Sequence, residues 1–267
     1  MPKQNLPARI FGGLNLTVFT LVMTFLYIPI IILIVYSFND ARIITSWKGF
    51  TLEYYARLLE NDAIKEALRN TLIIAVLSTL ISTVLGVLAA LGLENKRFRG
   101  RQGFLALIYT PLVIPDILMG VSLALLFNFA RVNTGMLTVL IAHVTFCVSY
   151  TIIVIQSRLE GFDYSLVEAA MDLGAKPGTI FRKIKLPLIM PGILAAALLA
   201  FTLSIDDFII TFFTSGRGFD TLPIYVEGTI RRGTITTINS LSTLMIAFTL
   251  FLVVITKRIR RILISSL

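Results

Sequence analysis

The sequence predicts an all-α membrane protein with six transmembrane helices. Of its 267 residues, 56% are hydrophobic and 15% are charged, whereas soluble domains carry about 25% charged residues. The mean hydropathy is +0.87, and several apolar runs reach the ~20 residues that a helix needs to cross a bilayer. We therefore expect residues 1–267 to form one transmembrane domain.

The expected spans, in chain order, are residues 14–38, 70–93, 104–130, 136–157, 188–213 and 239–256. The first run is too long for a secretory signal, and no small-residue cleavage site follows it, so we expect it to be retained. A short link, 131–135, joins the third and fourth spans, and one long re-entrant segment is the alternative there. Pro111 and Pro115 predict a bend in the third span, either beside a pathway or from ordinary packing.

The basic residues predict the orientation. Most of the 24 lysines and arginines fall on the same side as the N-terminus, and in the first segment on the opposite side, 39–69, acids balance the bases. Because cytoplasmic loops carry the excess of positive charge, both termini are expected in the cytoplasm. The net charge of +9 agrees with this topology and with attraction to anionic lipid headgroups. The bases are divided among short loops without interleaved aromatics, which disfavours nucleic-acid binding.

Within this first outer segment, residues 51–59 are amphipathic and begin with Thr51, a suitable N-cap. The pattern predicts a short helix along the outer membrane face. This helix would either pack against the bundle or dock an external partner.

One polar internal segment, residues 158–187, separates the fourth and fifth spans. Ser165 and Glu168 fit a capping box, and Gly174 stands where a helix end takes a left-handed residue. We therefore expect a helix of about two turns, or ~12 Å, across the inner membrane face, followed by a basic helix over 179–185. An ordered polar loop of this kind is a surface to which a soluble partner can bind. The alternative is a solvated hairpin that only links the two spans.

The spacing within this segment is specific. Glu168-Ala169-Ala170 is followed after three residues by Gly174, after nine more by Ile184, and after one more by Leu186-Pro187. This pattern resembles the coupling motif, or EAA motif, of the permease subunits of bacterial ABC importers. We therefore name residues 158–187 the coupling loop.

The resemblance implies a type I ABC importer permease fold and a docking role for the coupling loop. It places Glu168, Ala169, Ala170, Asp172 and Gly174 against a groove of a cytoplasmic ATPase dimer. That dimer would hold ATP and Mg²⁺, and this chain would bind no cofactor and would be a non-catalytic subunit. The two alanines would leave a smooth surface that the partner can approach closely.

The residues themselves give no sign of an enzyme. The sequence has no Gly-rich phosphate-binding loop and no nucleophile turn. His143 is the single histidine, which excludes a metal site of several imidazoles, and we expect it to be a buried hydrogen-bonding residue. The single cysteine, Cys147, lies in the fourth span and is expected to pack as a small apolar residue.

Charged side chains inside the spans give the best indication of the cargo. Each costs roughly 2.5–3.5 kcal/mol at the bilayer centre on insertion scales. Asp116 lies in the third span, and Asp206 and Asp207 lie in the fifth, with no lysine or arginine in these spans to pair with them. Unpaired acids favour a pathway for a cationic solute and disfavour an anionic one, and structural hydrogen bonding is the alternative.

The depth of these acids supports the same interpretation. Along straight helices, Asp116 and Asp206 would lie about 18 and 22 Å from the inner face, in the outer half of the bilayer. Asp206 and Asp207 would point about 100° apart on a helix. We therefore expect one of the two to face the pathway and the other to bond to a neighbouring helix or to cap a break.

Further stretches narrow the resemblance. Residues 27–33, 36–39, 115–117, 143–147, 157–163 and 203–207 together resemble the second permease subunit of spermidine/putrescine importers. The resemblance spans nearly the whole chain, and polyamines are flexible polycations, in agreement with the unpaired acids. It implies a bacterial inner-membrane location, a second permease subunit, a cytoplasmic ATPase dimer, an external solute-binding protein and a polyamine substrate.

Two other hypotheses stay open at this point. An importer of another solute, such as thiamine, ferric iron, an opine or an amino-acid derivative, would share much of the pattern. A secondary transporter driven by an ion gradient would need inverted repeats and a midplane ion site, and it would not need the coupling loop.

Overall fold

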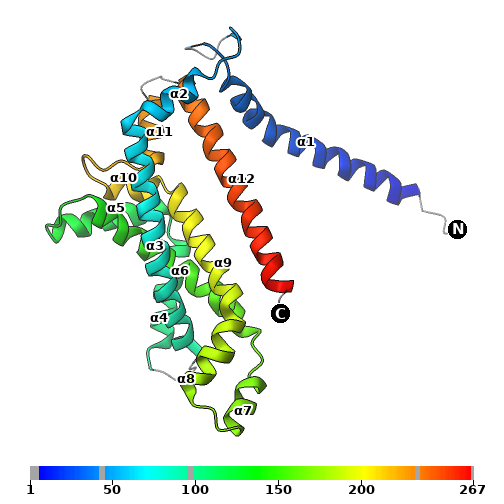
Figure 1. Ribbon diagram of the computed structural model, residues 1–267, viewed down its shortest axis with the longest axis vertical. Coiled ribbons are helices and arrows are strands. Elements are labelled where there is room, and N and C mark those ends of the chain that lie inside the picture. The colour runs from blue at the N-terminus through cyan, green and yellow to red at the C-terminus, as the bar shows by residue number, and fades with distance from the viewer. Residues whose placement is uncertain (1–5, 42–45, 95–98, 232–234, 266–267) are drawn as a thin grey trace. The chain divides into compact units, whose positions relative to one another are not determined.

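The computed structural model describes residues 6–41, 46–94, 99–231 and 235–265. This part of the chain is helical, with one isolated antiparallel bridge between Asn39 and Phe50. Its elements are α1 (Leu6–Tyr36), α2 (Glu53–Glu60), α3 (Asp62–Glu94), α4 (Arg101–Val113), α5 (Asp116–Phe129), α6 (Met136–Glu160), α7 (Ser165–Asp172), α8 (Pro177–Ile180), the π-helix η1 (Phe181–Lys185), α9 (Leu186–Asp206), α10 (Ile209–Thr214), α11 (Leu222–Arg231) and α12 (Ile235–Ser265) (Figure 1).

The contacts divide the chain into two compact units. Unit 1 consists of Met1–Asn61 and Gly228–Arg258, and unit 2 consists of Asp62–Glu227 and Ile259–Leu267. This division does not test whether residues 1–267 form one transmembrane domain, which stays a prediction. The cytoplasmic position of the two termini also stays a prediction.

The helix lengths confirm an all-α polytopic membrane protein. Four helical segments in the described part are long and apolar enough to cross a bilayer, namely Asn15–Tyr36, Asp62–Glu94, Met136–Glu160 and Pro177–Asp206. The bent pair of α4 and α5 makes a fifth if it is counted as one span. In the sixth predicted span, the described apolar helix Thr237–Phe251 is shorter than these.

The third predicted span, 104–130, is not one continuous helix. Its two halves, α4 and α5, meet at an angle of 114°. Pro115 has no N–H and forces extended backbone on Ile114, whose ψ is 131°, so α4 ends and a new helix begins at Asp116. In Figure 1, α5 lies across the direction of α3. The depth that we estimated for Asp116 along a straight helix is therefore wrong.

The fifth predicted span, 188–213, is also broken, although it has no proline at the break. Helix α9 ends at Asp206, Asp207 is extended with ψ of 121°, and α10 begins at Ile209. At its N-terminal end, this span begins earlier than expected. Pro177–Asp206 forms one helical segment through α8, η1 and α9, so the helix begins before residue 188.

Small residues hold the helices of unit 2 together. On α3 the buried positions Ser78, Ser82, Gly86 and Ala90 recur every fourth residue, and on α9 Gly192, Ala196, Ala200 and Ser204 do the same. Both helices pack against α6 and against each other. Apolar burial gives little driving force between helices in a bilayer, so close contact through small residues and interhelical hydrogen bonds takes its place.

Unit 1 contains the short helix that the sequence predicted for the first outer segment. Helix α2 begins at Glu53 with Leu52 at its N-cap, so the predicted Thr51 cap is wrong by one residue. The Thr51 hydroxyl still accepts a hydrogen bond from the Glu53 N–H at 3.1 Å. Tyr55 of this helix bonds to Ser37 through their hydroxyls at 2.6 Å. Ser240 of α12 donates to the Ser37 carbonyl at 3.1 Å, so the three segments of the unit are joined at one residue.

Candidate functional site

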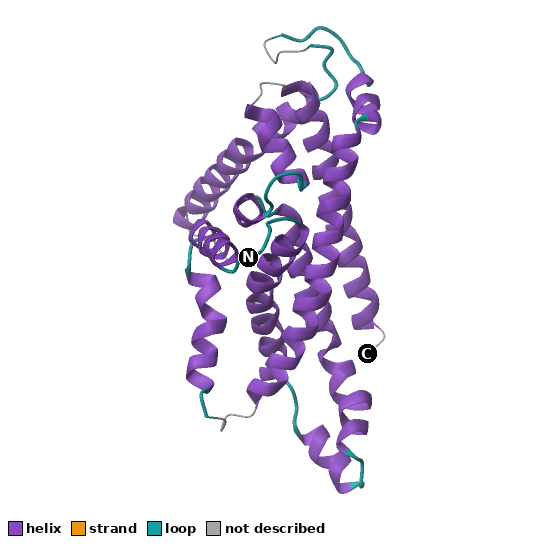
Figure 2. Cartoon of the chain, turned by 90° about the vertical axis from the view of Figure 1, so that its left-hand side faces the viewer, coloured by secondary structure: helices purple, strands orange, loops and turns teal. Residues whose placement is uncertain are grey.

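The coupling loop contains the predicted helix, α7, and Figures 1 and 2 show it with α8 at one end of unit 2. The helix ends in a Schellman motif, in which Ala175 N–H bonds to the Ala170 carbonyl at 3.0 Å and Gly174 N–H to the Met171 carbonyl at 2.8 Å. Gly174 has φ of +77°, as predicted, a conformation that other residues adopt only with strain. The turn after α7 is therefore fixed by the backbone.

The predicted capping box of Ser165 and Glu168 is wrong. Ser165 is the first residue inside α7, and the helix has Tyr164 at its N-cap, without a side-chain cap. The Asp163 carboxylate accepts the Ser165 N–H at 3.0 Å instead. Hydrogen bonds from Ser165 lower the pKa of Asp163, so an ionised acid lies just before the helix.

The motif residues of α7 differ in exposure. Glu168, Ala169, Asp172 and Gly174 are exposed, whereas Ala170 is buried. The expectation that both alanines form the open surface therefore holds for Ala169 alone. Three apolar side chains that the sequence analysis missed, Leu166, Met171 and Leu173, are 44%, 55% and 88% exposed beside them. In water such exposed apolar side chains on a short helix are typical of an interaction surface.

The return from α7 is less regular than predicted. In place of one basic helix over 179–185, the chain forms α8 and then the π-helix η1. At the end of η1 the Leu186 N–H bonds to the Phe181 carbonyl, five residues back. Arg158 of α6 fixes the helix that follows, because its Nε and Nη2 donate to the Leu188 carbonyl at 3.1 and 3.0 Å.

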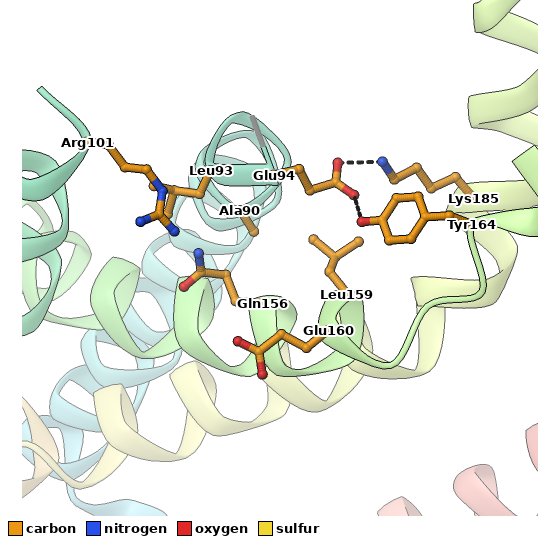
Figure 3. Close-up of a pocket in the computed structure, with 9 residues that line it drawn as sticks. All are labelled: Ala90, Leu93, Glu94, Arg101, Gln156, Leu159, Glu160, Tyr164 and Lys185. Atoms are coloured by element: carbon orange, nitrogen blue, oxygen red, sulfur yellow. Dashed lines mark hydrogen bonds and ion pairs between the residues drawn. The ribbon is translucent and has the colours of Figure 1, made fainter. Parts of the chain in front are cut away.

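A pocket of about 540 Å³ lies where the coupling loop meets the ends of the spans. Its lining residues are Ala90, Leu93, Glu94, Arg101, Gln156, Leu159, Glu160, Tyr164 and Lys185. Figure 3 shows Tyr164 and Lys185 together on one side of Glu94, and Arg101 and Gln156 on its other side. Tyr164 Oη donates to Glu94 Oε1 at 2.6 Å, and Lys185 Nζ forms an ion pair with Glu94 Oε2.

Tyr164 stays protonated in this contact. Partial burial and the neighbouring Glu94 carboxylate raise the pKa of Tyr164 to about 12. No local sequence pattern marks Glu94, Tyr164 or Lys185 as a cluster, because Glu94 lies 70 and 91 residues from its two partners. Two basic residues of the same region, Lys96 and Arg97, lie outside the described part of the chain.

The three acids predicted for the pathway lie at the two helix breaks. Asp116 is the first residue of α5, and Asp206 is the last residue of α9. Both are exposed, and neither carboxylate forms a hydrogen bond or an ion pair within the described residues. Helices α5 and α10, which begin at the two breaks, pack against each other, and a Cβ on Gly120 would lie 2.9 Å from Phe213.

Asp207 differs from its neighbour because it is held by other side chains. Its carboxylate is 9% exposed and accepts hydrogen bonds from Ile210 N–H at 3.3 Å and Thr211 N–H at 2.8 Å. The Thr211 hydroxyl donates to it at 2.7 Å, and His143 Nε2 lies 3.3 Å away. Asp207 therefore caps α10 and corresponds to the hydrogen-bonded member of the pair.

The hydrogen bonds around His143 connect four helices. His143 is 1% exposed, with Nδ1 2.7 Å from Ser204 Oγ and Nε2 2.9 Å from Thr211 Oγ1. Ser78 Oγ donates to Ser204 Oγ at 2.9 Å. Since the single hydroxyl proton of Thr211 goes to Asp207, Thr211 Oγ1 accepts from His143 Nε2–H. His143 thus has the structural role that the sequence predicted.

The described residues contain no group of three or more His, Cys, Asp and Glu side chains that could hold a metal ion. Cys147 is buried at 0% exposure, with its Sγ 3.6 Å from the Ala200 carbonyl. The arrangement can therefore do two things chemically. It presents an apolar and acidic surface on the coupling loop at one end of unit 2, and it exposes two unpartnered carboxylates at the helix breaks.

A multi-pass helical fold with such a loop is the arrangement expected for a membrane transport permease. The family described as "Binding-protein-dependent transport system inner membrane component" matches residues 82–267. The chain belongs to this family, and it is a multi-pass protein of the bacterial inner membrane.

Two curated relatives match most of the chain. The spermidine/putrescine transport system permease protein PotC of Haemophilus influenzae is 42% identical over 240 residues, which cover 90% of this chain and 93% of that protein. The putrescine transport system permease protein PotI of Escherichia coli is 44% identical over 250 residues, which cover 91% of this chain and 89% of that protein.

Solved structures share the fold. A bacterial ABC transporter involved in the import of the acidic polysaccharide alginate matches with a TM-score of 0.77 and 19% identity, over 97% of this chain and 99% of that chain. The MetNI methionine ABC transporter, in inward-facing conformations, matches with a TM-score of 0.61 and 18% identity, over 80% of this chain and 99% of that chain. These likenesses show an ABC importer permease fold.

Proposed function

We propose that this chain is a transmembrane permease subunit of an ATP-driven importer of polyamines, with spermidine and putrescine as cargo. The observation that carries the proposal is the identity of 42% and 44% to two permeases named for these solutes, across nine-tenths of the chain. The exposed carboxylates Asp116 and Asp206 support a polycationic solute, because a charge in a membrane span is expensive without a partner.

The proposed assembly contains further subunits. A second permease subunit completes the pathway, an external solute-binding protein delivers the polyamine, and a cytoplasmic ATPase dimer binds ATP and Mg²⁺. This chain catalyses no reaction and binds no cofactor, and both of its termini lie in the cytoplasm. The family description, which names transport dependent on a binding protein, supports this arrangement.

The coupling loop is the proposed docking site for the ATPase. The residues that would contact the ATPase directly are the exposed ones, Glu168, Ala169, Asp172 and Gly174. The buried Ala170 would pack α7 against the rest of the loop. Because Pro177–Asp206 is one helical segment, a displacement of the loop would travel along α9 to the break at Asp206. Closure of the ATPases would in this way change access to the pathway.

The cargo side of the proposal assigns different roles to the two neighbouring aspartates. Asp206 would contact an ammonium group of the polyamine, together with Asp116 at the break between α4 and α5. Asp207 would keep α10 in place through its bonds to Thr211 and His143.

The test is uptake of labelled spermidine and putrescine into vesicles that contain the complete reconstituted complex. We expect uptake that requires ATP and is unchanged when ionophores dissipate the ion gradients. Uptake that follows an imposed ion gradient, without ATP, would identify a secondary transporter and would overturn the proposal. Copurification of a cytoplasmic ATPase, lost in a variant without residues 165–174, would further support the docking site.

A further inference from the structure

Glu94 is the last residue of α3, and the turn before it is fixed in the bundle. Ala90 and Leu93 are 1% and 2% exposed. Ala90 packs in one cluster with Ile155 of α6 and Ile189 of α9, and Leu93 packs in another with side chains of α4 and α6. The Glu94 carboxylate therefore stands on a rigid support at the edge of the packed core.

Both partners of Glu94 belong to the coupling loop, and they lie on opposite sides of α7 in the sequence. Tyr164 directly precedes α7, and Lys185 ends η1, where the loop returns to α9. Tyr164 bonds to one carboxylate oxygen and Lys185 to the other. One side chain of α3 thus holds the loop at the place where it leaves the bundle and at the place where it returns.

The two partners also contact each other. Lys185 Nζ lies 6.0 Å from the centre of the Tyr164 ring, a favourable distance for a cation–π contact. Lys185 and Glu94 are 17% and 20% exposed, so solvent screens their ion pair less than it screens a surface pair. The three residues form a closed cluster, which is drawn in Figure 3. We name it the Glu94 clamp.

The backbone route from the coupling loop into the bundle is irregular at the same place. Lys185 lies in the π-helix η1, whose wider turn is often found at functional sites. The helices that η1 contacts are α7, α8 and α9, whereas α3 packs against α6 and α9. Through Tyr164, which precedes α7, the Glu94 clamp therefore adds a connection from the loop to α3 that does not pass through the π-turn.

We propose that Glu94 is a positioning residue that makes the coupling loop and α3 move as one body during transport. This inference rests on the proposed function, in which the ATPases displace the loop. The displacement reaches the bundle by two routes, through η1 into α9 and through the Glu94 clamp into α3. Without the clamp, ATP hydrolysis continues but moves less solute.

The first test measures polyamine uptake and ATP hydrolysis together in the reconstituted complex. We expect Glu94→Gln to lower uptake per ATP hydrolysed about tenfold, the size of one lost charge-assisted hydrogen bond, with hydrolysis maintained. Glu160→Gln is the matched control, because Glu160 lines the same pocket but has no partner within the described residues. The double variant E94K/K185E, which restores the ion pair in reverse, is expected to recover most of the ratio.

The second test does not depend on the cargo. Spin labels at Leu88→Cys on α3 and Lys176→Cys in the coupling loop, both exposed positions, are introduced into a Cys147→Ala background. With Glu94 present, we expect the distance between the two labels to have one narrow distribution. This distribution should be the same in the nucleotide-free and the ATP-trapped complexes. In Glu94→Gln the distributions of the two states should differ.

The outcomes separate the two proposals. Equal uptake per ATP in Glu94→Gln and Glu160→Gln, with identical label distances in both states, would overturn the role of Glu94. Absence of polyamine uptake by the wild-type complex would overturn the cargo instead, and the label distances would still decide the role of the clamp.

Discussion

The two ends of the helical segment Pro177–Asp206 use carboxylates in different ways. At the loop end, the partners of Glu94 are at least partly exposed, and the neighbouring helix α7 shows apolar side chains to solvent. At the other end, Asp207 is nearly buried and receives donors from Thr211 and His143. The first end therefore leaves apolar and charged side chains open to the docking partner proposed above, whereas the second end holds its own backbone together and leaves Asp206 free.

The largest effect is expected from removing the carboxylate of the buried end. Asp207→Ala removes the carboxylate that accepts from the Ile210 N–H, the Thr211 N–H and the Thr211 hydroxyl, and each unsatisfied buried group costs about 1–3 kcal/mol. We expect at least ~3 kcal/mol of destabilisation, measured as a lower thermal unfolding midpoint of the purified protein. Asp206→Ala is the matched control and should stay within about 0.5 kcal/mol of wild type. Equal destabilisation by both variants would contradict the comparison.

At the loop end, Gly174→Asp should abolish transport without affecting insertion. The backbone at φ of +77° strains any side chain by about 1 kcal/mol, and the new charge lies at the proposed docking surface. Uptake of labelled spermidine should fall more than about tenfold, at an unchanged amount of protein in the membrane. Gly178→Asp, at an open position without a positive φ, controls for charge alone. Normal ATP-driven uptake by Gly174→Asp would count heavily against the docking role.

A smaller effect is expected from the free carboxylate at the second end. Asp206→Asn keeps the shape and removes the charge that would pair with an ammonium group. Uptake should fall about tenfold, which corresponds to one partly desolvated ion pair, and Asp206→Glu should recover part of it. The initial rate of putrescine uptake at equal protein concentration measures both, and unchanged rates in Asp206→Asn would remove Asp206 from the pathway.

The smallest effect concerns the hydrogen bonds behind Asp207. Ser204→Ala removes the bonds from Ser204 to His143 and from Ser78 to Ser204. Interhelical hydrogen bonds of this kind contribute about 0.6 kcal/mol each in membrane proteins. We expect a slightly lower unfolding midpoint and uptake close to wild type. A loss as large as that of Asp207→Ala would show that the whole network, rather than the Asp207 cap, holds the break.

The sequence predicted what local patterns determine. The spacing of Glu168, Ala169 and Gly174 predicted the loop helix, and Gly174 has the backbone conformation that its position required. Pro115 predicted a bend in the third span, although a single proline does not determine the angle of 114°. The class of an all-α polytopic membrane protein followed from apolar runs of sufficient length.

Contacts between distant residues could not be predicted in the same way. No proline marks the break after Asp206. The side chain of Asp207 stabilises this break through contacts with Thr211 and His143, and these depend on where α6 places His143. The partners of Glu94 lie in another part of the sequence, and a glutamate at the end of a span resembles any interfacial charge. Ala170 matched the motif, but the packing within the loop buries it.

ATP-dependent uptake of labelled spermidine and putrescine by the reconstituted complex, measured for the wild type and for Asp116→Asn, decides whether this chain carries polyamines. We predict uptake by the wild type and a large loss in Asp116→Asn, because a free carboxylate at the helix break would contact the polycation. No polyamine uptake, together with ATP hydrolysis that responds to another solute, would contradict the assignment of the cargo.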